Sequence, residues 1–89
     1  GETRDVVMTT GTADFLLRVT GDSMVGAGIL SGDLLLVRKQ ATARLGQIVV
    51  AHVPGVGEVV KRLNEDTDSE RRFLVSENPA YAPIPVTVE

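Results

Sequence analysis

Turn-forming residues interrupt the chain at short intervals, which leaves no stretch long enough for an extended helix. Glycine, Pro-Gly and Asn-Pro signals recur from one end to the other, at Gly11, Gly21, Gly26, Gly28, Gly32, Gly46, Pro54, Gly57 and Asn78. Val, Ile and Thr supply more than a quarter of all residues, and such β-branched side chains favour strands. Short strands between regular turns predict an all-β domain.

The segments between the turns predict short antiparallel strands, at residues 5–8, 14–20, 33–39, 47–53, 58–63, 72–76 and 86–88. Residues 23–27 and residues 41–45 are each expected to form one helical turn. The sequence NEDTDSER at residues 64–71 predicts a charged hairpin loop. The whole chain, residues 1–89, has the length of a single small domain.

The composition excludes several classes of function. The net charge is −3 and aromatic residues make up 3% of the chain, which argues against a freestanding nucleic-acid-binding domain. With no cysteine and one histidine, we expect neither a metal site nor a cofactor. The lack of cysteine fits a reducing compartment. No apolar run approaches the roughly 18 residues of a membrane span, so we expect a cytoplasmic protein without membrane contact.

One serine lies where a predicted strand runs into a predicted helical turn. Gly21, Asp22 and Ser23 follow the strand at 14–20 and precede Met24. Free backbone N–H groups at the start of a helical turn can hold an oxyanion, which makes Ser23 a candidate nucleophile. The same spacing also fits a simple N-cap by Asp22 or Ser23, and on spacing alone the N-cap is the more common of the two.

A serine nucleophile needs a base, and the chain offers two candidates. His52 lies within the predicted strand 47–53 without a carboxylate motif to complete a triad, which is typical of a structural or rim histidine. Period-two alternation places Lys61 on one face with Val59 and Leu63. Burial of that face would lower the pKa of Lys61, and a neutral lysine can act as a general base. The alternative is a lysine at a strand edge whose stem covers apolar surface.

Several ordered segments resemble the peptidase domain of the LexA family of repressors. They read DFLLRVTGDSM at 14–24, GILSGDLLLV at 28–37, GQIVVA at 46–51, VVKRL at 59–63 and ENPAYAPI at 77–84. The resemblance covers roughly residues 14–86 and keeps the order of the family's segments. It implies a small β domain of the LexA and signal-peptidase type.

The resemblance also implies a function and a set of site residues. Ser23 matches the nucleophile of a Ser-Lys dyad that cleaves the repressor's own chain, and Lys61 matches its general base. The backbone N–H groups of Ser23 and Met24 become the expected oxyanion donors. The family's activity is latent and is stimulated when RecA on single-stranded DNA binds the repressor after DNA damage. The implied partners are the RecA filament, a second copy of the chain, and operator DNA bound through a separate N-terminal domain.

The chain departs from the family pattern in several places. The family's N-terminal winged helix-turn-helix and its closing strand, which helps to form the dimer, are absent from these residues. We therefore expect residues 1–89 to be a C-terminal peptidase domain that is truncated at both ends. No Ala-Gly pair precedes Ser23 as a scissile bond, and Ala27-Gly28 lies inside the motif that follows the serine.

Other interpretations stay open on the sequence alone. UmuD-like polymerase subunits and phage repressors share the domain. A dimerisation and RecA-binding module without catalysis is a further alternative, although both dyad residues are present. A type I signal peptidase also combines Ser-Met with a Val-Lys-Arg strand. That family has Pro-Thr-Leu soon after Ser-Met, where this chain has Val25-Gly26-Ala27.

Overall fold

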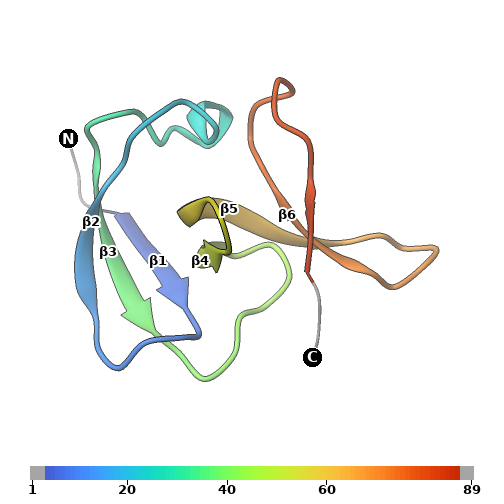
Figure 1. Ribbon diagram of the computed structural model, residues 1–89, viewed down its shortest axis with the longest axis horizontal. Coiled ribbons are helices and arrows are strands. Elements are labelled where there is room, and N and C mark those ends of the chain that lie inside the picture. Colours follow the sequence, from blue (N-terminus) through green and yellow to red (C-terminus); the bar gives the residue numbers. More distant parts are fainter. Residues whose placement is uncertain (1–3, 87–89) are drawn as a thin grey trace.

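The computed structural model describes residues 4–86, and most of its regular structure is strand (Figure 1). The strands are β1 (Arg4–Met8), β2 (Phe15–Arg18), β3 (Leu34–Lys39), β4 (Ile48–Val53), β5 (Gly57–Glu65), β6 (Arg72–Val75) and β7 (Ile84–Pro85). The helical element of this part of the chain is η1, a single 3-10 turn at Val25–Ala27. Between residues 4 and 86 there is no helix of the length and apolarity that crossing a membrane requires. The predicted all-β class is confirmed, as is the helical turn expected within 23–27.

The seven described strands form one mixed sheet in the order β2-β3-β1-β4-β5-β6-β7. β1 runs parallel to both of its neighbours, β3 and β4. The other four pairings are antiparallel, as expected. Local alternation specifies which residues face the core but does not specify which strand will be the neighbour, so the parallel pairing of β1 was not predicted.

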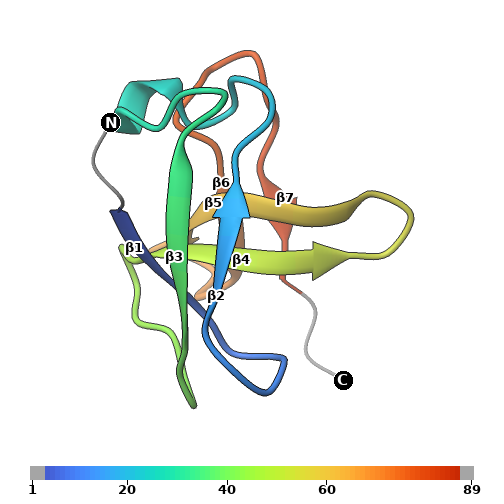
Figure 2. The ribbon, with the colours of Figure 1, turned by 90° about the vertical axis from the view of Figure 1, so that its left-hand side faces the viewer.

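The sheet curls at a narrow junction between its two halves. β1 and β4 share a single residue pair, Val7 with Val49, and β2 and β3 cross in front of β4 and β5 in Figure 2. The larger core cluster combines both halves with the loop between β2 and β3, and its buried members are Val6, Met8, Val19, Met24, Ile29, Leu35, Val37 and Val50. The buried members of the smaller cluster are Val7, Val49, Leu63 and Leu74. Val6 and Val7 thus face different clusters, as strand alternation requires.

The helical turn expected at residues 41–45 is absent, and this prediction was wrong. The Arg44 N–H donates to the side-chain Oε1 of Gln47 at 2.8 Å, and Gln40 Nε2 donates to the Thr42 carbonyl at 3.1 Å. These local side-chain bonds satisfy backbone groups that a helical turn would otherwise pair with one another.

The last strand begins earlier than the pattern predicted. β7 comprises Ile84 and Pro85, and Ile84 pairs with Leu74 of β6. The predicted strand at 86–88 therefore lies too late, and its positions 87 and 88 fall outside the described residues. The charged hairpin is confirmed, although β5 continues to Glu65 and shortens the loop.

Candidate active site

Ser23 lies in the loop between β2 and β3, soon after β2 ends. The loop is closed at its base where the N–H of buried Val19 donates to the Asp33 carbonyl at 2.8 Å. Gly21 then turns the chain with a φ of 84°, a left-handed value that glycine adopts without strain. Met24 is buried and anchors the following residue in the larger core cluster. Ser23 therefore lies between the turn at Gly21 and the buried side chain of Met24, and it is itself half-buried.

The N-cap interpretation of this loop was wrong. The residue before η1 is Met24, and no side chain caps the turn. Among residues 4–86, neither the Ser23 N–H nor the Met24 N–H donates a hydrogen bond. Two unpaired backbone donors beside a serine hydroxyl are what an oxyanion hole requires. Neither N–H group is therefore engaged elsewhere among the described residues, and their role as oxyanion donors stays a prediction.

Lys61 lies in the middle of β5 and is only 6% exposed. It pairs with Val49 of β4, and the pairing of β5 with β6 begins one residue later, at Arg62. The burial of Lys61 itself argues against the alternative of a lysine that reaches solvent at a strand edge. Val59 and Leu63 belong to the smaller core cluster, which confirms the predicted apolar face. Burial lowers the pKa of Lys61 below its ordinary value of 10.5, because desolvation disfavours the ammonium. Among the described residues no carboxylate forms an ion pair with Lys61.

Ser23 and Lys61 line the same cleft, which has a volume of about 180 Å³. Its lining consists of residues 17–20, Ser23, Met24 and residues 58–61. One wall is therefore the end of β2 with the Ser23 loop, and the other wall is the first half of β5. A half-buried hydroxyl in the same cleft as a desolvated amine is a combination that general-base activation of a serine can use.

The charged groups that line this cleft with Lys61 already have partners. Arg18 donates from Nη1 to the Gly32 carbonyl at 2.9 Å, and Glu58 lies 3.6 Å from Nδ1 of His52. Within residues 4–86, no three His, Asp or Glu side chains gather into a potential metal-binding group. The cleft also contains the hydroxyls of Thr20 and Ser23 and the amine of Lys61.

His52, the alternative base, lies outside the cleft. Its side chain is 60% exposed on β4, and its cross-strand partner is Glu58. It is not among the residues that line the cleft around Ser23. The interpretation of His52 as a rim residue fits this exposed contact with Glu58.

The sequence analysis missed the contact between Lys61 and Tyr81. The Lys61 Nζ lies 5.3 Å from the centre of the Tyr81 ring, within the range of a cation–π interaction. The Tyr81 hydroxyl donates a 2.6 Å hydrogen bond to Oδ1 of Asp22. This bond raises the pKa of Tyr81 above its ordinary value of 10.0. The sequence signals nearest to Tyr81 were the segment ENPAYAPI of the family resemblance and its Asn78-Pro79 turn, and neither indicates where the ring will lie.

Comparison with known proteins identifies close relatives of this chain. It is 51% identical over 77 residues to LexA repressor 1 of Xanthomonas campestris pv. campestris, which covers 85% of this chain and 36% of that protein. It is 52% identical over 79 residues to LexA repressor 2 of Pseudomonas putida, with 88% and 37% covered. The LexA repressor of Shewanella piezotolerans is 50% identical over 82 residues, with 92% and 38% covered.

The matches cover most of this chain but a much smaller share of each relative. The chain spans little more than a third of the length of the relatives that it matches. The family model described as Peptidase S24-like, in contrast, matches residues 2–89. Because that match covers nearly the whole chain, the chain belongs to the S24-like peptidase family.

Proposed function

We propose that this chain is the catalytic domain of a LexA-type repressor that cleaves its own polypeptide with Ser23 and Lys61. The observation that carries the proposal is the cleft that Ser23 shares with the buried Lys61, in a chain of the S24-like peptidase family. Identity of about half the aligned residues to LexA repressors favours a repressor over the other proteins that share the domain.

The chemistry follows from the two side chains. Neutral Lys61 takes the proton from the Ser23 hydroxyl as Oγ attacks the carbonyl carbon of the scissile peptide bond. The N–H groups of Ser23 and Met24 stabilise the oxyanion of the tetrahedral intermediate. The Lys61 ammonium then protonates the leaving amine, and the resulting acyl-enzyme is hydrolysed by a water that Lys61 deprotonates.

The full protein is proposed to act with several partners in the cytoplasm. A RecA filament on single-stranded DNA would stimulate cleavage by favouring the conformation that places the scissile segment over Ser23, which is a population shift. A second copy of the chain would form the dimer. Operator DNA would bind to a separate domain, and the greater length of the LexA repressors leaves room for one.

Self-cleavage of the full-length protein tests the dyad, followed by electrophoresis and mass spectrometry between neutral pH and about pH 10. We expect Ser23→Ala and Lys61→Ala each to lower the rate at least about a thousandfold while the fold is retained, because the members of a dyad act as a unit. His52→Ala is the control and should cleave at the wild-type rate. Retained cleavage in either dyad variant would reject the assignment.

The effect of RecA is tested on the same proteins. Filaments assembled on single-stranded DNA should accelerate cleavage by the wild-type protein and by His52→Ala, and should leave the two dyad variants inactive. A protein that binds the filament but is never cleaved would be a dimerisation and RecA-binding module without catalysis.

A further inference from the structure

The loop at residues 77–81, between β6 and β7, packs against the Ser23 loop. Both loops lie at the top of Figure 1. The Gly26 N–H donates to the Glu77 carbonyl at 2.8 Å, and Asn78 Nδ2 donates to the Asp22 carbonyl at 3.0 Å. The 77–81 loop therefore contacts the chain on both sides of Ser23.

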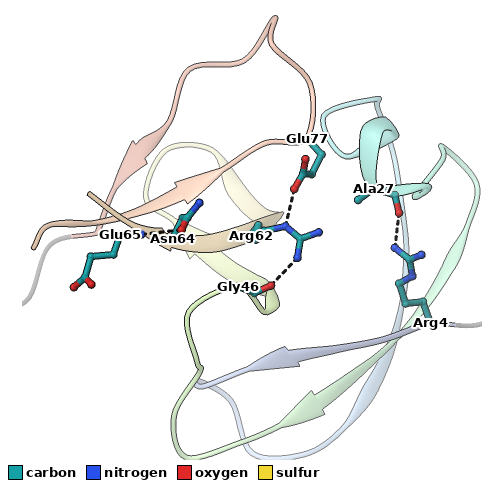
Figure 3. Close-up of polar contacts among 7 residues, drawn as sticks. All are labelled: Arg4, Ala27, Gly46, Arg62, Asn64, Glu65 and Glu77. Carbon is teal, nitrogen blue, oxygen red and sulfur yellow. Dashed lines mark hydrogen bonds and ion pairs between the residues drawn. The ribbon is translucent and has the colours of Figure 1, made fainter. Parts of the chain in front are cut away.

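The same loop is also anchored to the strand that carries the base. Arg62, the residue after Lys61, donates from Nε to Oε1 of Glu77 at 2.6 Å. Its Nη1 donates to the Gly46 carbonyl, also at 2.6 Å (Figure 3). Within the loop, Asn78 Oδ1 accepts from the Ala80 N–H at 3.0 Å and the Asn78 carbonyl accepts from the Tyr81 N–H at 3.1 Å. These bonds fix the backbone at Tyr81 and therefore the point from which its side chain extends.

Tyr81 connects the two halves of the dyad. Its ring lies 5.3 Å from the Lys61 Nζ, and its hydroxyl bonds to the Asp22 carboxylate, next to Ser23 in the chain. We propose that Tyr81 is a positioning residue, whose hydroxyl holds the Ser23 loop through Asp22 and whose ring holds the Lys61 ammonium. This inference rests on the proposed function of Ser23 and Lys61 and assigns a role to a residue outside the cleft lining.

Because no described carboxylate forms an ion pair with Lys61, the contact with the Tyr81 ring matters for the charged form of the lysine. The charged groups that share the cleft with Lys61 are Arg18 of β2 and Glu58 of β5 itself, and Asp22 lies beyond the Tyr81 hydroxyl. An aromatic face attracts a cation, and here the Lys61 side is buried while the Tyr81 side is 45% exposed. The raised pKa of Tyr81 keeps its hydroxyl a donor at the alkaline pH at which lysine loses its proton. The hydroxyl contact with Asp22 therefore persists while Lys61 loses its proton, whereas the ring attracts only the charged form of Lys61, which is the form present after it has accepted the proton of Ser23.

Covalent labelling of Ser23 tests the hydroxyl contact. A fluorophosphonate forms an O–P bond with an activated serine as fluoride leaves and the serine proton passes to the base. We expect Tyr81→Phe to slow labelling about tenfold at the pH of maximal rate, because the bond to Asp22 is lost. Asp22→Ala removes the same bond from the other side, so it should slow labelling equally, and the double variant should be no slower than either. Wild-type labelling in Tyr81→Phe, or additive losses in the double variant, would overturn this half of the proposal.

Nuclear magnetic resonance tests the ring contact without any catalysis. The chain holds two lysines, Lys39 and Lys61, so a sample with ¹³C-labelled lysine gives one titrating signal from the site and one exposed reference. Tyr81→Phe keeps the ring and should leave the Lys61 midpoint unchanged. Tyr81→Leu keeps apolar cover but removes the aromatic face, so the midpoint should fall by about half a pH unit. An unchanged midpoint in Tyr81→Leu would overturn the ring contact.

The two measurements separate the possible failures. If Ser23→Ala and Lys61→Ala label as fast as the wild type, the proposed dyad is wrong, whereas the lysine titration still decides whether the ring holds Lys61. If both dyad variants lose labelling and Tyr81→Phe does not, the dyad stands and the positioning role of the Tyr81 hydroxyl is rejected. Thermal unfolding of each variant completes the test. A lowered melting temperature with unchanged labelling and titration would show a merely structural tyrosine.

Discussion

The Gly26 N–H donates a 2.8 Å hydrogen bond to the carbonyl oxygen of Glu77, and a Cβ on Gly26 would lie 2.6 Å from that same oxygen. A contact this short with a backbone atom cannot be relieved by rotating a side chain. The φ of Gly26 is not among the left-handed values found at other glycines. Glycine is therefore required here by the close approach of two loops and not by its own backbone angles.

Gly26→Ala is predicted to destabilise the fold by about 1–3 kcal/mol, because the 77–81 loop must move away from the Ser23 loop. Urea unfolding measures this loss, and fluorophosphonate labelling should slow in the same variant. Gly11→Ala is the matched control, since Gly11 has a φ of 85° and a Cβ added there would meet no atom within 4 Å. It should cost about 1 kcal/mol through backbone strain but leave Ser23 labelling unchanged. Equal labelling by both variants would contradict the prediction.

The ion pair between Arg62 and Glu77 is predicted to stabilise the attachment of the 77–81 loop. The two side chains are 32% and 34% exposed, and Nε lies 2.6 Å from Oε1. Arg62→Met loses this pair together with the bond to Gly46, and we expect it to cost about 1–2 kcal/mol in urea unfolding. Glu77→Gln keeps an acceptor oxygen and should cost less than about 1 kcal/mol.

The effect of salt tests how much of the attraction between Arg62 and Glu77 comes from their charges. Raising the ionic strength to about 1 M should reduce the stability difference between the wild type and Glu77→Gln, because exposed charges are screened. A difference that does not change with salt would mean that the geometry of the bond, and not its charge, holds the loop.

Much of the fold could be predicted because its determinants are local. The alternation in β5 predicted that Lys61 shares a buried face with Val59 and Leu63, and the structure confirms it. The parallel neighbours of β1 could not be predicted, since Val7 pairs with Val49, a residue far along the chain that no local pattern identifies. The helical turn at 41–45 failed because side-chain hydrogen bonds satisfied that backbone instead.

The candidate site, like the fold, could be predicted only in part. Ser23 and Lys61 were identified from residue patterns and a family resemblance, and the structure places both on one cleft, while their catalytic roles stay a prediction. The contact of Lys61 with Tyr81 joins two distant segments through a ring that is 45% exposed. Neither hydrophobic periodicity nor turn signals report such a contact, because both describe only neighbours in the sequence.

Ser76→Ala is predicted to be neutral or to stabilise the protein by up to about 1 kcal/mol. Ser76 is 9% exposed, and among the described residues its Oγ has no hydrogen-bond partner. A buried hydroxyl without a partner costs desolvation that alanine does not incur. Ser69→Ala is the control, because Ser69 Oγ donates to Asp66 at 3.1 Å and accepts from the Arg71 N–H at 3.3 Å. Chemical denaturation should show a loss of stability in Ser69→Ala but not in Ser76→Ala. A clear loss of stability in Ser76→Ala would reveal a partner for its Oγ.

The buried lysine makes stability depend on pH in a defined direction. Burial lowers the pKa of Lys61 in the folded state below the ordinary 10.5 that applies when the chain is unfolded. Between these two values the unfolded chain binds more protons than the folded one, so stability rises with pH across that window. Below the folded pKa both states are protonated, and the full cost of burying the ammonium is present.

Lys61→Met is therefore predicted to raise the free energy of unfolding by about 1 kcal/mol at neutral pH, because it keeps the length of the side chain and removes the buried charge. The advantage of the variant should shrink as the pH rises from the folded pKa of Lys61 towards 10.5, since the wild type then loses its proton and its penalty. Urea unfolding of both proteins at a series of pH values measures the difference. A gap that stays constant across this window would mean that the amine is not desolvated in the folded chain, and the same result would remove the physical basis for Lys61 as a base.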